Sequence, residues 1–94
     1  MFVVIVDMSV KPDSEQTLQQ IFKTIFLSAI SEQKGFAGVQ LLQPQDAGAD
    51  YRLIIQFENQ VLQQAWVATP LHERVWPQIE DCCSKYAVQK FTSV

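Results

Sequence analysis

The sequence has few charged residues and no cluster of basic ones. Charged residues make up 18% of the 94 residues, below the usual share of about a quarter, and seven Lys and Arg stand against ten Asp and Glu. The basic residues are scattered along the chain, so no surface suited to a phosphate backbone is predicted. We therefore expect no nucleic-acid partner.

Cysteine is also scarce. The only two cysteines, Cys82 and Cys83, are adjacent, which excludes an ordinary disulfide framework, and no Cys or His spacing is typical of a zinc site. We interpret them as reduced, partly buried thiols, with a vicinal disulfide or a redox role as the alternative. No metal site is expected.

Long apolar runs are missing as well. The run that begins the chain reaches an acid at Asp7 after six apolar residues and has no basic leader, too short for a signal peptide or a membrane span. The sequence therefore predicts a cytoplasmic location and no membrane partner.

Apolar side chains, by contrast, are abundant for a short chain. They make up 48% of the residues, and 11% are aromatic. A chain of this length rarely forms two cores, so one domain over residues 1–94 is expected. Because so small a domain cannot easily bury that much apolar surface, we expect a partner to cover part of it.

Alternating apolar residues and turn signals predict four strands, at Phe2–Val10, Phe36–Gln43, Asp50–Glu58 and Tyr86–Phe91. In the first strand the even positions are all apolar, whereas the odd positions begin with Val3 and Ile5 and become polar at Asp7 and Ser9. Both faces of this strand are therefore expected to be at least partly buried.

Three helical segments are predicted between the strands. Asp13 followed by Gln16 indicates a capped helix start, and an apolar stripe from Leu18 to Ile30 continues until Gly35 offers a stop. Asn59 can cap a short second helix. Thr69 and Pro70 end that helix and begin a third, in which Pro77 must kink the helix or lie in its opening turn.

This order of elements predicts an α+β fold. Right-handed crossovers place the first and third strands in the centre of an antiparallel sheet, with the helices on one face. The expected architecture is a ferredoxin-like βαββαβ sandwich. Its second face would carry Val3 and Ile5, or their even-numbered neighbours, so we expect two copies to pack sheet to sheet as a barrel-like homodimer.

Two segments carry a family resemblance. The run FENQVLQQAWVATPLH, from Phe57 to His72, is similar to the antibiotic biosynthesis monooxygenase family, in which a strand's aromatic end leads into a helix, a bend and a histidine. The segment GFAGV, from Gly35 to Val39, resembles that family's entry to its second strand. The resemblance implies a dimeric α/β barrel with a pocket between helices and sheet, used by several members for oxygenation without metal or flavin.

The implied activity is that of a cofactor-independent monooxygenase acting on a small aromatic, quinol-like or polycyclic molecule, with molecular oxygen as co-substrate. His72, the only histidine, is the candidate base, and Asp7 could orient the imidazole or a substrate hydroxyl. Aromatic walls would hold a flat, small hydrophobic molecule. The candidate wall residues are Trp66, Trp76, Phe22, Phe26 and Tyr51.

Each candidate residue also has a structural explanation. The tryptophan and phenylalanine residues lie on inward stripes and could be ordinary core. Asp7 could be a solvated carboxylate at a strand end, and Tyr51 could lie on the strand surface or at an interface. His72 could be a solvated or hydrogen-bonded residue of a helix's first turn. A dimeric binding domain without chemistry therefore stays open as the second function.

Two other activities of the family are less expected. Haem-degrading relatives use an asparagine on the first strand and a histidine farther from the tryptophan, whereas this strand carries Asp7 and the interval from Trp66 to His72 is shorter. Other relatives isomerise small phosphorylated compounds, and the lack of clustered Arg and Lys argues mildly against such a ligand.

Overall fold

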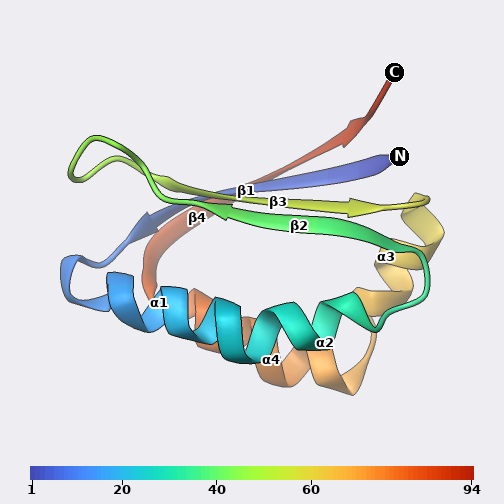
Figure 1. Cartoon of the computed structure of the whole chain (residues 1–94), viewed down its shortest axis with the longest axis horizontal. Helices are drawn as coiled ribbons and strands as arrows, with labels where there is room; N and C mark the ends of the chain where they lie inside the picture. Colours follow the sequence, from blue (N-terminus) through green and yellow to red (C-terminus); the bar gives the residue numbers. More distant parts are fainter.

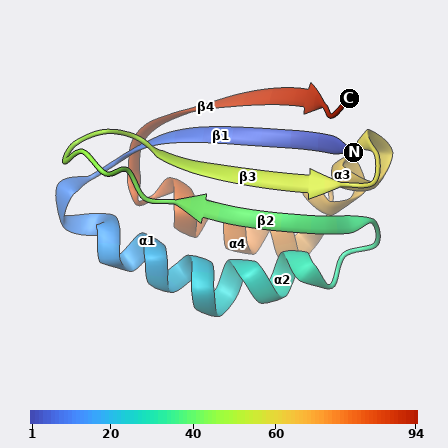
Figure 2. The same ribbon diagram turned by 45° about the horizontal axis from the view of Figure 1, so that its top comes forward.

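The computed structural model describes residues 1–94. Its four strands are β1 (Phe2–Val10), β2 (Phe36–Leu42), β3 (Tyr51–Phe57) and β4 (Cys83–Thr92). They form one antiparallel sheet in the order β2-β3-β1-β4, with β1 and β3 in the centre (Figure 2). The helical segments are η1 (Pro12–Ser14), α1 (Glu15–Ile21), η2 (Phe22–Phe26), α2 (Leu27–Ser31), α3 (Gln60–Val67) and α4 (Pro70–Glu80). The predicted ferredoxin-like α+β fold is confirmed.

The two faces of the sheet differ because side chains alternate along each strand. Val4, Val6 and Met8 of β1 are buried beneath the helices, all of which lie on one side of the sheet (Figure 1). Val3 and Ile5 point to the other side, which no helix covers. We call this second side the open face.

The helix after β1 differs from the predicted one in two ways. Pro12 opens a separate 3-10 turn, so Asp13 lies inside that turn and its predicted role as the helix cap is wrong. Farther on, η2 is a π-helical stretch, in which the backbone N–H of Leu27 donates to the carbonyl of Phe22. Apolar residues recur here every four positions, a spacing that drifts around a regular helix of 3.6 residues per turn. One wider turn corrects the drift and buries both Phe26 and Ile30.

The cap predicted at Asn59 is confirmed, and Thr69, where a new helix was predicted to begin, supplies a second one. The side-chain oxygen of Asn59 accepts from the backbone N–H of Leu62 at 3.0 Å, at the start of α3. The hydroxyl of Thr69 does the same for His72 at 3.1 Å, at the start of α4. Pro77 lies inside α4, where it removes one backbone donor without ending the helix.

The last strand is longer than predicted. It begins at Cys83 rather than Tyr86, because Cys83 and Lys85 pair with Val10 and Ser9 of β1 across a register shift. As the edge strand, β4 exposes most of its side chains. The pocket described below opens next to it.

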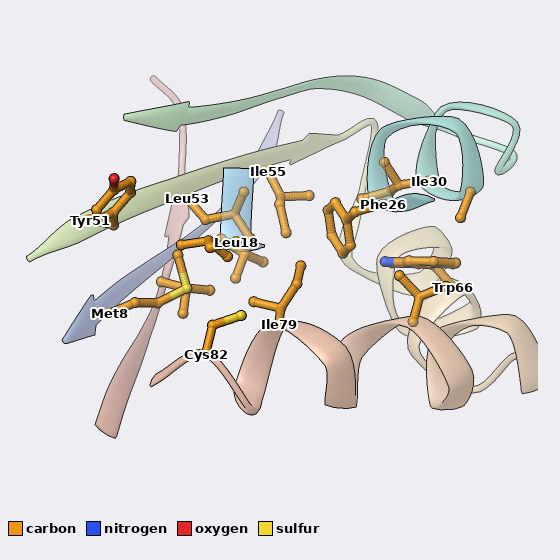
Figure 3. Packing of buried hydrophobic residues seen from close by; sticks show 14 of the residues in the cluster. Met8, Leu18, Phe26, Ile30, Tyr51, Leu53, Ile55, Trp66, Ile79 and Cys82 are labelled. Atoms are coloured by element: carbon orange, nitrogen blue, oxygen red, sulfur yellow. The ribbon is translucent and has the colours of Figure 1, made fainter. Parts of the chain in front are cut away.

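The core lies between the helices and the side of the sheet that they cover. Tyr51 and Trp66, both almost fully buried, stand at its opposite ends (Figure 3). Cys82 is buried and Cys83 half-buried, and both thiols are free. Burial, more than any neighbouring charge, raises the pKa of each thiol. None of the helices has the length and apolar character needed to cross a bilayer.

Two glycines with the same backbone conformation test the packing between α3 and the start of β2. Gly35 and Gly48 both have a φ of 82°, but a Cβ on Gly35 would lie 2.4 Å from Leu62, whereas one on Gly48 would meet nothing. Gly48→Ala should cost about 1 kcal/mol, and Gly35→Ala about 2 to 4 kcal/mol, because overpacking adds to the backbone cost. Urea unfolding measures both, and equal losses would contradict this account of Gly35.

Candidate active site

A pocket of about 170 Å³ lies between the helices and the sheet, beside the edge strand β4. Its walls come from η2, α3 and α4 on one side and from the helix-facing side of β1, β3 and β4 on the other. Nine of its eleven lining residues are hydrophobic. They are Val4, Val6, Phe26, Ile55, Gln63, Trp66, Val67, His72, Trp76, Tyr86 and Val88.

Helix α3 supplies one wall through residues that share a single helical face. Gln63, Trp66 and Val67 are spaced three and four positions apart, so they lie side by side. Trp66 is almost fully buried, whereas Val67 is exposed at the rim. The wall therefore runs from the core to the mouth of the pocket.

One hydroxyl group fixes the bend that joins this wall to the next. Thr69 Oγ1 donates to the carbonyl of Trp66 at 2.8 Å and accepts from the backbone N–H of His72 at 3.1 Å. The bend brings the two rings together, with the His72 ring edge-on to Trp66 at 5.0 Å between centroids. Thr69 and Pro70 thus form the bend across which the two rings meet.

Helix α4 extends the aromatic lining toward the sheet. His72 and Trp76 are four residues apart, and their rings are nearly parallel at 6.2 Å between centroids. Trp76 in turn meets Tyr86 of β4 edge-on at 5.6 Å. Phe26 closes the floor at 6.2 Å from Trp66 and 6.4 Å from Trp76. The rings leave flat surfaces on which an aromatic molecule can pack.

The imidazole of His72 is available for proton transfer. Burial lowers its pKa from the ordinary value, and the negative charges of Glu73 and Glu80 only partly oppose this effect. His72 is therefore neutral at pH 7, the form that can accept a proton. Its backbone N–H bonds to Thr69, but neither ring nitrogen makes a hydrogen bond within the chain.

Tyr86 brings a second polar group to the mouth of the pocket. Its hydroxyl donates to Glu80 Oε2 at 2.7 Å. This hydrogen bond is the main reason why the pKa of Tyr86 is raised, and Trp76 opposes it. Tyr86 therefore remains a neutral phenol, held by Glu80 beside Trp76.

The structure brings together four of the residues proposed from the sequence: His72, Trp66, Trp76 and Phe26 all line this pocket. Phe22 and Tyr51 line a different one, of about 180 Å³. Tyr51 lies at the end of the core opposite Trp66 (Figure 3). Tyr51 is not on the surface, as one interpretation held, but buried. Its hydroxyl donates to Glu15 at 2.9 Å and accepts from Gln19 at 2.9 Å, and burial raises its pKa.

Asp7 lies on the open face, away from the pocket. Its carboxylate pairs there with Arg52, with Nε 2.8 Å from Oδ1. The alternation of a strand explains this placement, since Asp7 is odd-numbered and the positions of β1 that line the pocket are Val4 and Val6. The structure does not bring Asp7 to His72, so the orienting role predicted for it has no geometric basis.

Sequence reasoning missed several lining residues. Gln63 could have been found, because it is a polar residue on the same helical face as Trp66. Tyr86 and Val88 face the same side as Met8 and Val6, their partners in the ladder, and only the pairing register reveals this. The chain holds no group of three or more His, Cys, Asp or Glu side chains that could bind a metal ion.

Comparison with known protein families then identifies the chain. The family model for antibiotic biosynthesis monooxygenase matches residues 1–76. The chain belongs to the antibiotic biosynthesis monooxygenase family. A search of curated protein sequences gives no match.

Solved structures share the fold of this family member. SnoaB, a cofactor-independent oxygenase from Streptomyces nogalater, is similar in a mutant form with a TM-score of 0.87 and 15% identity, over 98% of this chain and 91% of that one. A putative antibiotic biosynthesis monooxygenase from Nitrosomonas europaea has a TM-score of 0.84 and 19% identity, over 100% and 99%. A mutant of MhuD with manganese protoporphyrin IX bound has a TM-score of 0.83 and 22% identity, over 100% and 95%.

The single histidine of this family member makes its titration directly measurable. We expect the His72 imidazole to titrate below its ordinary pKa of 6.5, because burial disfavours the charged form. Glu80→Gln should lower the pKa further, since it removes a charge that favours protonation. NMR shifts of the one imidazole report both values, and a midpoint at or above 6.5 in the parent would contradict this description of the site.

Proposed function

We propose that this protein is a cofactor-independent monooxygenase that encloses a small aromatic substrate in the pocket, with His72 as the base that deprotonates it. The observation that carries the proposal is an imidazole, free of hydrogen bonds within the chain, set between Trp66 and Trp76. Burial lowers its pKa, which favours the neutral form that can accept a proton. The similarity in fold to SnoaB, a cofactor-independent oxygenase, supports it.

The reaction requires little from the protein. A phenol that loses its proton becomes electron-rich enough to reduce dioxygen itself. For 1-naphthol, one oxygen atom enters the ring as a second carbonyl and the other leaves as water, so that 1-naphthol and dioxygen give 1,4-naphthoquinone and water. All four electrons come from the substrate. His72 takes up the hydroxyl proton, and the apolar walls exclude water.

The size of the pocket favours a substrate of one or two rings. An engineered cavity of about 150 Å³ in another protein holds benzene, and drug-sized ligands occupy roughly 300 to 1,000 Å³. At about 170 Å³ the pocket is near the lower of these limits. Because its mouth lies beside the exposed edge of β4, a second ring can extend outward. Larger polycyclic substrates would require the walls to move.

The volume of the pocket also argues against haem as its ligand. Haem exceeds the available volume, and the His72 ring that would face an iron is already packed between Trp66 and Trp76. The porphyrin seen in MhuD is a property of that protein. We therefore propose that the pocket does not bind haem, and a titration with haem followed by its Soret band tests this directly.

The proposal includes a homodimer formed through the open face. Ile5 and Ile54 are direct partners in the sheet, and Val3 pairs with Phe91, so four apolar side chains lie next to each other there. Phe91 is 46% exposed in the single chain. Exposing such an apolar patch to water is unfavourable, and a second copy of the chain offers the same apolar surface to cover it. The cytoplasmic location expected from the sequence remains a prediction.

Oxygen uptake tests the activity. We expect the protein to consume dioxygen with 1-naphthol, and more slowly with three-ring anthrone, with one labelled oxygen atom from dioxygen in the product. His72→Gln should lower kcat/KM by about 10²-fold or more, because the amide cannot accept the proton. In the parent, kcat/KM should rise with pH and level off above a midpoint below 6.5, as His72 loses its proton.

The control is Gln78→Ala on the exposed side of α4, which should keep the parent rate. Equal rates for the parent and His72→Gln would remove His72 from the mechanism. No uptake with any substrate, despite ligand binding, would favour the alternative of a small-molecule binding domain without chemistry.

A charge in the centre of the open face should break the dimer. Ile54→Lys places an ammonium opposite Ile5, where desolvation would be costly. Light scattering should give the mass of two chains for the parent and of one chain for the variant. Val61→Lys, on an exposed position of α3, adds the same charge elsewhere and should leave the dimer intact. A stable monomeric parent at micromolar concentration would overturn the dimer.

A further inference from the structure

Gln63 is the one buried polar residue of the chain, with 8% of its surface exposed. It lines the pocket between Trp66 and Val67 on the inward face of α3. Its backbone N–H bonds to the carbonyl of Asn59, but its side-chain amide has no hydrogen bond within the chain. The helix therefore places an unpaired amide where an apolar residue would pack equally well.

The amide is not sealed inside the protein. No fully buried side-chain nitrogen or oxygen lacks a partner in this structure, so the unpaired amide atoms of Gln63 must keep some access to open space. The open space beside Gln63 is the pocket that it lines. Buried polar groups are almost always hydrogen-bonded, and a group that finds no partner in its own chain meets one in water or a ligand.

We propose that the side-chain amide of Gln63 binds an oxygen substituent of the aromatic molecule in the pocket. This inference rests on the proposed function of the pocket and assigns Gln63 as the group that recognises the hydroxyl or carbonyl oxygen of such a substrate. Since the amide offers both donors and an acceptor, it fits a phenol before deprotonation and a phenolate oxygen afterwards. The other lining residues apart from His72 and Tyr86 offer only apolar side chains or indole donors.

The arrangement has a consequence for orientation. Gln63 is on α3 and His72 is on α4, on either side of the bend at Thr69, and both line the same pocket. Trp66 follows Gln63 by one turn and meets the His72 ring edge-on. A ring that packs against Trp66 is therefore held by its face, while the amide selects which edge of the ring carries the oxygen.

The test compares two ligands of nearly equal shape, 1-naphthol and 1-methylnaphthalene, in the parent and in Gln63→Met. Binding is followed through the indole N–H signals of Trp66 and Trp76 by NMR. Methionine keeps the length and volume of the side chain but removes the amide. The affinity for 1-naphthol relative to 1-methylnaphthalene should fall by roughly 3- to 10-fold in Gln63→Met, the amount expected for one neutral hydrogen bond.

Gln64→Met is the matched control, because Gln64 is exposed on the same helix, and it should keep the parent's ratio. A ratio unchanged in Gln63→Met, with both ligands still bound, would overturn the role of Gln63 alone. If neither ligand shifts either indole signal in the parent, the proposed function of the pocket fails, and this inference fails with it.

Discussion

The hydroxyl group of Thr69 links the two helices, α3 and α4, that supply one side of the site. It donates to the last turn of α3 at the carbonyl of Trp66 and accepts from the first turn of α4 at the amide of His72. The carbonyl of Trp66 also accepts from the backbone N–H of Thr69 at 3.1 Å, so the hydroxyl adds a second hydrogen bond there. At the start of α4, the amide of His72 belongs to the first turn and would lack a partner within the helix. The rings of Trp66 and His72 lie 5.0 Å apart across this bend, so one capping side chain helps to position the only imidazole of the chain.

The sheet imposes the second constraint, because each strand must divide its side chains between two environments. The even positions of β1 build the pocket and the core, whereas the odd positions build the open face. Asp7 and Arg52 form their ion pair on that open face. The site and the expected dimer interface thus share the strands β1, β3 and β4 but no side chain, and a substitution on one face need not disturb the other.

Much of the fold was predictable because it depends on local patterns. Short stretches of sequence are enough to predict the alternation in β1 and β3, the cap at Asn59 and the bend at Thr69. The π-helical turn was signalled too, by apolar residues every four positions from Leu18 to Ile30, but a stripe of that kind also suits an ordinary helix whose ends are less buried.

The site was only partly predictable, because which residues line it depends on where the helices and strands meet in space. Helical spacing placed Trp66, His72 and Trp76 on inward faces, yet could not tell which end of the core each aromatic residue reaches. Phe22 and Phe26 are one turn apart and line different pockets. Tyr86 joins the site through the pairing of β4 with β1, a long-range register that no local pattern contains.

The two thiols that follow α4 bear on how well the protein would withstand the proposed oxygenation. Reactions that activate dioxygen can leak peroxide when a substrate is released too early, and peroxide attacks cysteine in its deprotonated form. Burial raises the pKa of both Cys82 and Cys83, so at neutral pH they remain in the sluggish protonated form. Their seclusion would make the protein tolerant of an oxidant formed in the adjacent half of the molecule.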